Sequence, residues 1–370
     1  MKSISCIAVI LLLLLSSCEK KNRVYMPDTN CSYSDEGAID TLNGTLLGVN
    51  IIAGIQGVEI VDSFLLIMQE DRQKIFTVYN TNSDSVVAEF GKIGKSASEL
   101  SDAPSYCYFI EEDGDKCMCI QDAMAPITRV YDWGKTMEEK HLVHKKNVRH
   151  SFAAMCDCNF YYIGNEHCVL CQGLYCDNIG DGLLKPPFVA LYEGNAEKSR
   201  LSYFGNLIGN DLSTSNLIHA TTTDINPKKK KIVQIPYIFD QLSIVDYDNM
   251  TSLGVSNSEC YDYEEMQEIV DSSADFADFV KKVIYYNKNV NVTDNYIVLL
   301  QDGKYTVAKC ESAEPHETMV KIFDWNGNHI KTFCVREYLR HIAYDEMSNT
   351  LFGATLDGEI YKYKIDEKLN

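Results

Sequence analysis

Cysteine is the residue type with the clearest chemical potential in this chain. Five of the 14 cysteines lie close together, at Cys156, Cys158, Cys168, Cys171 and Cys176. Thiolates at paired spacings of this kind can hold Zn²⁺ or an iron–sulfur cluster. Cysteines two positions apart in a strand, however, share one face and pack there as small apolar residues. Packing is the favoured interpretation, a disulfide and a thiolate–metal site are the alternatives, and we predict no metal or cofactor site.

Clusters of like charge are the next candidates for chemistry. The segment 111–115, Glu-Glu-Asp-Gly-Asp, resembles a calcium loop but lacks the further ligands and the closing Glu of an EF-hand. We predict that it is a hairpin turn, as is 356–360, because Asp-Gly readily takes positive φ angles. The basic run 228–231 could bind a polyanion, but in so acidic a chain it is better explained as an exposed turn.

Motifs for nucleophilic or phosphate chemistry are absent from the sequence. It contains no Gly-x-Ser-x-Gly elbow, no His-Glu-x-x-His and no glycine-rich phosphate loop. Its eight histidines are scattered, and His150 and His167 flank the cysteine group without ligand-like spacing. We therefore assign no catalytic and no cofactor-binding residue from sequence.

The N-terminus has the pattern of an export signal. Lys2 is followed by an apolar run that ends in five leucines and then Ser16-Ser17-Cys18. The run is shorter than the ~20 residues of a membrane-spanning helix. Its end resembles the bacterial lipobox, which implies cleavage after residue 17 and lipidation of Cys18, whereas an ordinary secretory signal is the alternative. Several acyl chains on one residue would anchor the protein durably.

The remaining chain is strongly acidic. Loss of residues 1–17 removes only Lys2 among charged residues, which leaves 33 basic and 53 acidic side chains and a formal charge of −20. Nucleic acid is therefore not an expected partner. We expect a tether over 18–40, because the segment is small and polar without an apolar period, and a folded domain over 41–370.

The folded region reads as many short strands with an internal repeat. Runs rich in Val, Ile, Tyr and Phe alternate with Gly, Asn, Asp and Ser. An apolar–aromatic pair followed by a turn residue recurs roughly every 40 to 50 residues, which is typical of a propeller blade. Six candidate third strands carry versions of it, at 78–80, 130–132, 191–193, 245–247, 322–324 and 363–366. The fold predicted is an all-β, six-bladed propeller, and a pair of β-sandwiches is the alternative.

Two further features complete the predicted architecture. The last blade has three strands, so the run 45–51 is expected to supply its fourth strand and close the ring. Helical periodicity appears clearly at one place, where Met266, Ile269, Val270, Phe279 and Val283 recur at steps of three and four. We therefore predict a helical insertion at about 260–286 between blades four and five, over one mouth of the ring.

The lipobox, the six degenerate blades and the phrase Glu89 to Leu100 (EFGKIGKSASEL) together resemble the TolB-like six-bladed propeller lipoproteins of Bacteroides-type bacteria. That family's Phe-Gly-basic-x-Gly segment usually continues into Gly-Pro-x-Glu-Phe, and here Ser96-Ala97 replaces Gly-Pro. A fainter copy begins at Tyr203. The resemblance implies a fold and an envelope location, and it brings no established chemistry.

Three functions remain open. The first is a non-enzymatic binding or scaffold lipoprotein, monomeric in its domain, for a protein, peptide or glycan of the envelope. It fits the Tyr-rich composition, because tyrosine is common at recognition surfaces. The second is a calcium-dependent propeller hydrolase or lactonase, which needs Glu, Asp and Asn from several blades to converge in the channel. The third is a thiolate–metal or redox protein. The predicted location is the outer membrane, facing the periplasm, with the cell surface as the alternative.

Overall fold

A computed structural model describes residues 27–34, 39–49, 51, 53–96, 98–122, 125–150, 158–172, 176–177, 184–185, 188–202, 211–258, 261, 263–310, 316–365 and 369. The signal segment and the lipidation call on Cys18 lie outside these residues, as does the phrase that begins at Tyr203.

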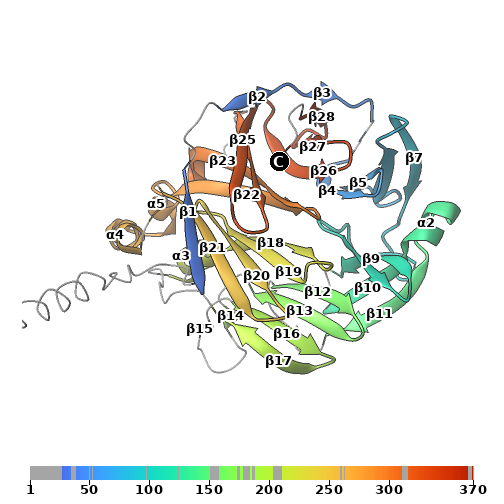
Figure 1. Ribbon diagram of the computed structural model, residues 1–370, viewed down its shortest axis with the longest axis horizontal. Helices are drawn as coiled ribbons and strands as arrows, with labels where there is room; N and C mark the ends of the chain where they lie inside the picture. Colours follow the sequence, from blue (N-terminus) through green and yellow to red (C-terminus); the bar gives the residue numbers. More distant parts are fainter. Residues whose placement is uncertain are drawn as a thin grey trace, which may run out of the picture.

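The strands of the described chain form six blades around a common centre, which confirms the predicted propeller (Figure 1). Each blade is one antiparallel sheet whose first strand is innermost. Blade 1 consists of β4 (Ile55–Val61), β5 (Phe64–Gln69), β6 (Phe76–Asn80) and β7 (Ser85–Phe90), and blade 2 consists of β8 (Tyr108–Glu112), β9 (Asp115–Gln121), β10 (Ile127–Asp132) and β11 (His144–Arg149). Blade 3 consists of β12 (Cys158–Gly164), β13 (His167–Gln172), β16 (Phe188–Glu193) and β17 (Ala196–Leu201), and blade 4 consists of β18 (Thr221–Asn226), β19 (Lys231–Pro236), β20 (Gln241–Asp246) and β21 (Thr251–Asn257). Blade 5 consists of β22 (Ile284–Val292), β23 (Tyr296–Thr306), β24 (Thr318–Asp324) and β25 (His329–Val335), and blade 6 contains β26 (Leu339–Asp345), β27 (Thr350–Thr355) and β28 (Ile360–Lys364). A small sheet of β14 (Cys176–Asp177) and β15 (Leu184–Lys185) lies beside them.

The repeated apolar–aromatic phrase marks the end of the third strand in every blade, as predicted. In four blades the ladder to the fourth strand shifts register at this phrase, between Val78 and Tyr79 in blade 1 and at the matching positions of blades 2, 3 and 5. Such a bulge bends a strand and increases its twist. The phrase therefore marks the point where the third and fourth strands change register.

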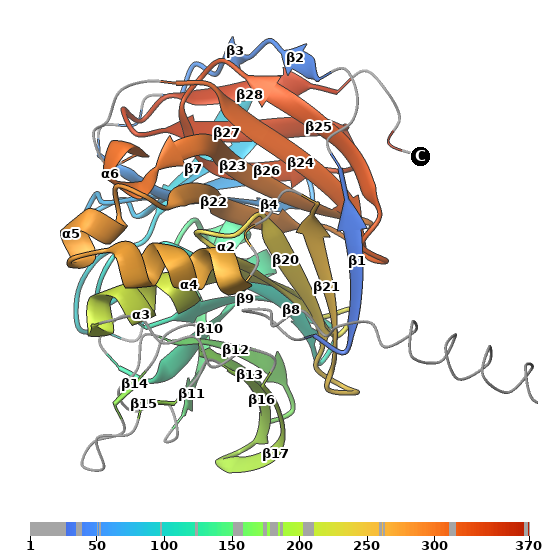
Figure 2. The ribbon, with the colours of Figure 1, turned by 90° about the vertical axis from the view of Figure 1, so that its left-hand side faces the viewer.

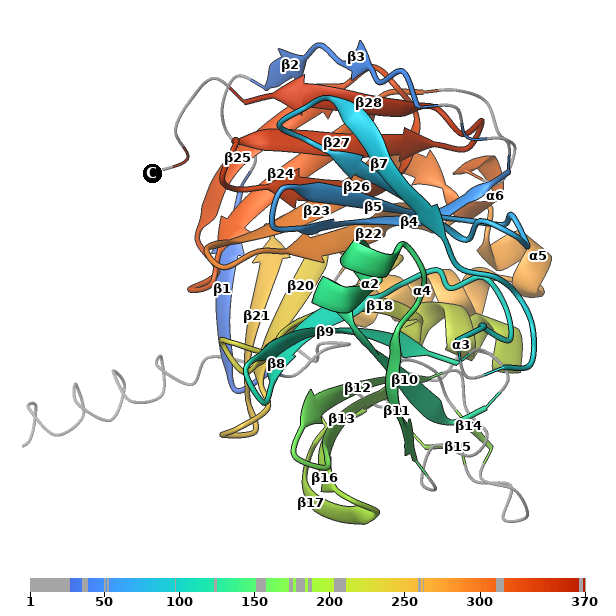
Figure 3. The same ribbon diagram turned by 90° about the vertical axis from the view of Figure 1, so that its right-hand side faces the viewer.

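The polar residue that ends the phrase forms the following turn. Asp246 Oδ1 accepts the backbone N–H groups of Asp248 and Asn249, and Asp324 Oδ1 accepts those of Asn326 and Asn328. A short carboxylate or amide that bonds to the backbone two or three residues ahead stabilises a tight turn. In blade 2 the equivalent Asp132 caps helix α2 (Trp133–Glu139), seen beside blades 1 and 2 in Figure 3.

The N-terminal part of the domain closes the ring and adds two outer strands. β3 (Thr45–Leu46) pairs with β28, so the prediction that the 45–51 run completes blade 6 is confirmed, with a strand of only two residues (Figure 3). β2 (Asp40–Leu42) adds in parallel to β25. In place of the tether expected over all of 18–40, β1 (Thr29–Tyr33) adds in parallel to β21 of blade 4. Its exposed polar side chains hid this strand from the sequence pattern, because a sheet edge needs only backbone groups.

The two faces of the ring differ in what they carry. Turns between first and second strands and between third and fourth strands lie on one face, here called the hairpin face. The connections between blades lie on the opposite face, here called the connection face. The connection face carries α3 (Leu212–His219), α4 (Tyr263–Ser272), α5 (Phe276–Phe279) and α6 (Val307–Cys310), which Figure 2 shows gathered at the left of the molecule, with β1 at the right.

The predicted helical insertion is confirmed as α4 and α5, between blades 4 and 5. Met266, Val270 and Phe279 are fully buried, in one hydrophobic cluster with Ile225 and Tyr108 from the first strands of blades 4 and 2. The apolar face of the insertion therefore packs onto the inner part of the ring. Of the helices in the described ranges, none is long and apolar enough to span a membrane.

Candidate functional site

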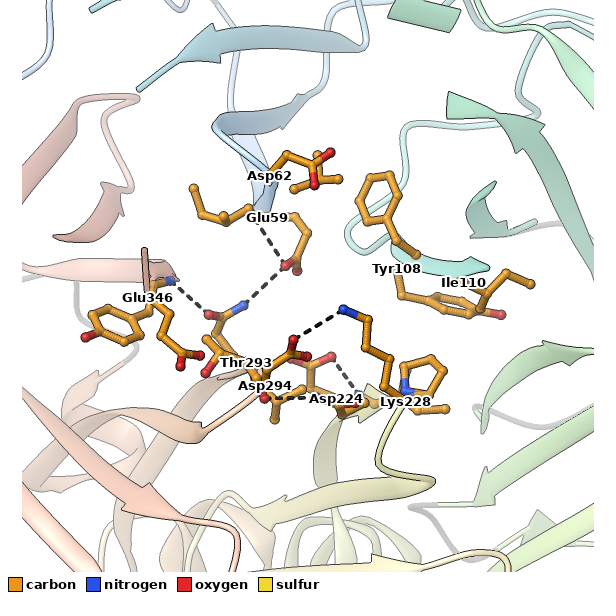
Figure 4. Close-up of a pocket in the computed structure, with 18 of the residues that line it drawn as sticks. Glu59, Asp62, Tyr108, Ile110, Asp224, Lys228, Thr293, Asp294 and Glu346 are labelled. Atoms are coloured by element: carbon orange, nitrogen blue, oxygen red, sulfur yellow. Dashed lines mark hydrogen bonds and ion pairs between the residues drawn. The ribbon is translucent and has the colours of Figure 1, made fainter. Parts of the chain in front are cut away.

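A cavity of about 680 Å³ lies at the centre of the ring and opens on the hairpin face (Figure 4). The first strands of all six blades line it, near their C-terminal ends, through Glu59, Ile110, Ile163, Asp224, Asn291 and Tyr344. The turns that follow the first strands of blades 1, 4, 5 and 6 form most of its rim. The cavity is thus the mouth of the central channel, assembled from segments nearly 290 residues apart.

The lining is acidic. It contains two lysines, Lys116 and Lys228, and seven carboxylates, which are Glu59, Asp62, Glu111, Asp224, Asp294, Asp345 and Glu346. Both lysines are paired at the rim, Lys116 Nζ at 2.5 Å from Asp62 and Lys228 Nζ at 3.2 Å from Asp294. The deeper carboxylates, Glu59 and Asp224, have no cation beside them among the lining residues, so the channel mouth has an excess of negative charge.

Asp224 is buried, with 4% of its surface exposed. Its Oδ1 accepts hydrogen bonds from the Tyr106 hydroxyl at 2.5 Å and from the Ile225 N–H at 2.7 Å, and its Oδ2 accepts one from the Val292 N–H at 2.8 Å. Burial raises the pKa of Asp224 to about 6 although these three donors favour the charged form. The carboxylate is fixed in position by blades 2, 4 and 5 at once.

Glu59 lies across the channel from Asp224, on the first strand of blade 1 (Figure 4). Its Oε1 accepts hydrogen bonds from its neighbour Ile60 N–H at 3.1 Å and from Asn291 Nδ2 at 3.4 Å, and Asn291 Oδ1 accepts one from Tyr344 N–H at 2.9 Å. Burial raises the pKa of Glu59 well above its usual range, and the charge of Asp224 raises it further. A cation between the two carboxylates would relieve this repulsion.

Aromatic rings form the wall behind Asp224. Tyr106 and Tyr108 stack with ring centroids 5.9 Å apart, and both meet Tyr161 edge-on at 5.9 and 5.3 Å. Tyr108 belongs to the same hydrophobic cluster as Met266 and Phe279 of the inserted helices. The cavity therefore ends, on the side of the connection face, in an apolar and aromatic layer. Aromatic faces next to carboxylates form a common environment for bound cations.

The two described side chains of the cysteine group, Cys168 and Cys171, do not line this cavity. Cys168 and Cys171 are buried on β13 in two different hydrophobic clusters, and Cys117 and Cys119 are buried together on β9. Residues three apart in a strand point to opposite faces, so Cys168 and Cys171 cannot share one metal ion. Cys156 lies outside the described residues, and only the backbone of Cys158 and Cys176 is described. The thiols of Cys117, Cys119, Cys168 and Cys171 pack in the hydrophobic core. Burial raises the pKa of Cys119 well above its usual value.

The charged clusters form turns, as predicted. Asp113 and Gly114 take φ angles of 56° and 84° in the β8–β9 hairpin, and Gly358 takes 84° in the β27–β28 hairpin. Lys228 to Lys230 form the exposed β18–β19 turn. Two residues of these turns, Glu111 and Lys228, also line the cavity, which the sequence analysis did not predict. His150 is buried, and burial lowers its pKa to about 4.

A central calcium ion fits this channel poorly. Glu59, Asp224 and Asn291 converge from three blades, as the hydrolase hypothesis requires. However, Asp224 already accepts three protein hydrogen bonds and the amide oxygen of Asn291 accepts one, so these side chains leave enough acceptor positions for an ammonium group but too few oxygens for a calcium ion. Calcium takes six to eight oxygen ligands. Among the residues that the structure describes, no group of three or more His, Cys, Asp or Glu side chains has an arrangement for a metal ion.

The central residues carried a sequence signal that motif searching does not detect. Glu59, Asp224 and Asn291 each lie on the first strand of a blade, three residues before the hairpin residue Asp62, Pro227 or Asp294. Polar residues at equivalent positions of several innermost strands must face the same channel. Once the blades are aligned, this recurrence identifies the site.

Comparison with known proteins supports the fold. No family model matches the sequence, and no curated protein matches it. Among solved structures, a Bacteroides fragilis protein whose title reads "putative exported protein" is similar, with a TM-score of 0.56, 10% identity, and coverage of 92% of this chain and 100% of that one. At this identity the likeness shows the fold alone. The class that fold and cavity define is a six-bladed propeller with an acidic channel mouth, and membership of the TolB-like lipoproteins stays a prediction.

Proposed function

We propose that this protein is an envelope lipoprotein that binds a ligand carrying a positively charged amine in its channel mouth. The observation that carries the proposal is the buried Asp224 and the half-buried Glu59, which face one cavity whose two lysines, Lys116 and Lys228, are paired with other carboxylates at the rim. Charged groups that are buried without a partner are costly, and a ligand ammonium group would supply the missing charge.

The shape of the site supports binding more than catalysis. Asp224 is held by donors from three blades, and such a preorganised acceptor loses little entropy when a ligand arrives. Tyr106 and Tyr108 add aromatic surface beside it. The lipid anchor on Cys18 is part of the proposal and is supported by the lipobox-like sequence.

The test is a ligand panel on the mature domain without Cys18. Ethanolamine and putrescine serve as amine probes, glycerol and glucose as neutral probes, and glutarate as an anionic probe. Melting temperature and isothermal titration calorimetry report binding. The amines are expected to raise the melting temperature and the other probes are not.

Two variants and a matched control locate the binding. Asp224→Asn and Glu59→Gln each remove a carboxylate from the cavity and are expected to weaken amine binding at least tenfold. Asp248→Asn makes the same chemical change in an exposed hairpin away from the cavity, where Lys230 Nζ lies 2.9 Å from Asp248, and should bind as the wild type does. Binding of the neutral or anionic probes in preference to amines would overturn the proposal.

A further inference from the structure

The chain enters the propeller on the face that bears the cavity. Asp28 Oδ2 accepts the N–H of Ser252 at 2.7 Å, and Ser252 follows the β20–β21 hairpin. β1 then runs parallel to β21, so Thr29 lies near the hairpin face and Tyr33 lies near the connection face, where its hydroxyl donates to Asp240 at 2.7 Å. The segment that leads from Cys18 therefore reaches the domain at the edge of the hairpin face.

The length of this segment restricts how the domain can sit on a membrane. Ten residues from Cys18 to Asp28 can span at most about 35 Å. A route to a membrane at the connection face would first have to pass the height of β21, about 24 Å for seven residues. A membrane at the hairpin face leaves the whole reach available, so the tether favours that orientation.

The rim of the cavity has the chemistry of a membrane-facing surface. Met347 lines the rim with 88% of its surface exposed, which makes it the most exposed large apolar residue of the described chain. The lysine turn, Lys228 to Lys230, lies on the same face, and lysines near a bilayer are attracted to lipid phosphates. Met347 and the lysine turn thus stand at the rim together with the carboxylates Asp62, Asp294 and Glu346, and Glu59 and Asp224 lie deeper.

This order of charges matches one kind of headgroup. In an ethanolamine phospholipid the phosphate stays near the bilayer and the primary ammonium group extends away from it. Seen from the membrane, the cavity presents at its rim the ion pairs Lys228–Asp294 and Lys116–Asp62, whose lysine ammonium groups can also meet a phosphate, and then Glu59 and Asp224 toward its floor. The ammonium group has three N–H donors for these carboxylates.

We infer that the hairpin face docks on the bilayer that holds the Cys18 lipid, and that the cavity receives the ammonium headgroup of an ethanolamine phospholipid from that bilayer. The inference rests on the proposed amine-binding function and adds the source and direction of the ligand. Tethering raises the effective headgroup concentration, so that even a weak site is occupied.

Orientation is tested by hydrogen–deuterium exchange of the full lipidated chain in vesicles, compared with the unlipidated domain. The vesicles consist of phosphatidylcholine with a minor fraction of either phosphatidylethanolamine or its N-acetyl derivative, which lacks the ammonium charge. Slower exchange is expected at the hairpins 227–230 and 345–349, with no change at the connection-face loops 70–75 and 237–240. Protection of the connection-face loops instead, or of neither face, would overturn the inference.

The headgroup is tested in the same vesicles. Protection of Asp224 and its neighbours is expected with phosphatidylethanolamine, and not with the N-acetyl lipid or in Asp224→Asn. Equal protection with both lipids would overturn the headgroup assignment. Calorimetry of the unlipidated domain with O-phosphoethanolamine separates the two proposals. Binding of O-phosphoethanolamine without hairpin protection in vesicles would support the proposed function and contradict this inference. Absence of binding in both assays would contradict both proposals.

Discussion

Tyr106 of blade 2 donates a hydrogen bond to Asp224 of blade 4, across the channel and over 118 positions in sequence. The bond joins two blades that are not neighbours in the ring. It also places an aromatic ring beside the carboxylate that the proposed ligand would contact. The same residue thus positions the acceptor and shapes the cavity.

Removal of this hydroxyl should change the titration of Asp224. In Tyr106→Phe the charged form loses one of its three donors, so the pKa of Asp224 is expected to rise above about 6. A hydrogen bond to a charged group contributes about 1.5–3 kcal/mol. The ¹³C carboxyl shifts of Asp-labelled protein report the titration. Tyr79→Phe, which removes a hydroxyl bonded to Asp84 on the outside of blade 1, is the control and should leave it unchanged.

The pH dependence of stability should show two opposite contributions. Burial raises the pKa of Asp224 from 3.8 to about 6, so the folded state binds more protons in this range, and the stability present below about pH 4 is lost as the pH rises through 6. Relative to wild type, Asp224→Asn is therefore expected to gain up to about 3 kcal/mol between about pH 4 and pH 7, measured by urea unfolding. A pH-independent difference would contradict the buried, charged Asp224.

Asp240→Asn is the matched variant of opposite sign. Burial acts to raise the pKa of Asp240, but Lys321 at 2.9 Å and hydrogen bonds from Tyr33 and Gln301 outweigh it and lower the pKa below 3.8. The stability that Asp240 contributes is present at neutral pH and is lost as the pH falls through its folded pKa. The deficit of Asp240→Asn should accordingly shrink in acid, whereas that of Asp224→Asn should grow.

Ring closure should depend on one leucine next to β3. Leu47 is 6% exposed in a cluster shared by blades 6 and 1, and Leu46 is 53% exposed. Leu47→Ala is expected to cost about 2–4 kcal/mol of unfolding free energy, and Leu46→Ala less than about 0.5. Urea midpoints measure both. Equal effects would mean that the short closing strand does not secure the ring.

The N-terminal strand should stabilise the junction of blades 4 and 5 through Tyr33. Its hydroxyl donates to Asp240 at 2.7 Å and accepts from Lys321 at 3.0 Å, inside a buried ion pair. Tyr33→Phe should cost about 1.5–3 kcal/mol because both charged partners lose a hydrogen bond. Tyr361→Phe removes a hydroxyl that donates to the exposed Glu359 and should be nearly neutral. A neutral Tyr33→Phe would show that β1 adds little to the fold.

Local sequence was sufficient to predict the blades because the same strand and turn pattern recurs in each blade. An aromatic residue before an Asp or Asn ends the third strand in three blades, at Tyr79-Asn80, Tyr131-Asp132 and Phe323-Asp324. The helical insertion was equally predictable, because its apolar residues recur with a period of 3.6 residues, whereas those of the flanking strands recur with a period of two. β1 was missed because a parallel edge strand is fixed largely by backbone pairing, and its two inward residues, Cys31 and Tyr33, are too few to show a pattern in sequence.

The site could not be derived in the same way. Glu59 and Asp224 are ordinary residues in ordinary strands, and their chemistry arises when the ring closes, buries Asp224 and brings Glu59 to face it across the channel. The described cysteines Cys117, Cys119, Cys168 and Cys171 are packed in the core and lie outside the cavity lining. Residue type alone was a poor guide to the candidate site, and the burial and charge of the side chains in the folded ring were a better one.

The central claim is tested most directly by a crystal structure of the mature domain with a heavy-atom-labelled primary amine, such as 3-bromopropylamine, at neutral pH. The account predicts anomalous density in the channel mouth, with the amine nitrogen about 3 Å from carboxylate oxygens of Glu59 and Asp224, and loss of that density in Asp224→Asn. Density only elsewhere on the surface, or an unchanged site in the variant, would contradict it.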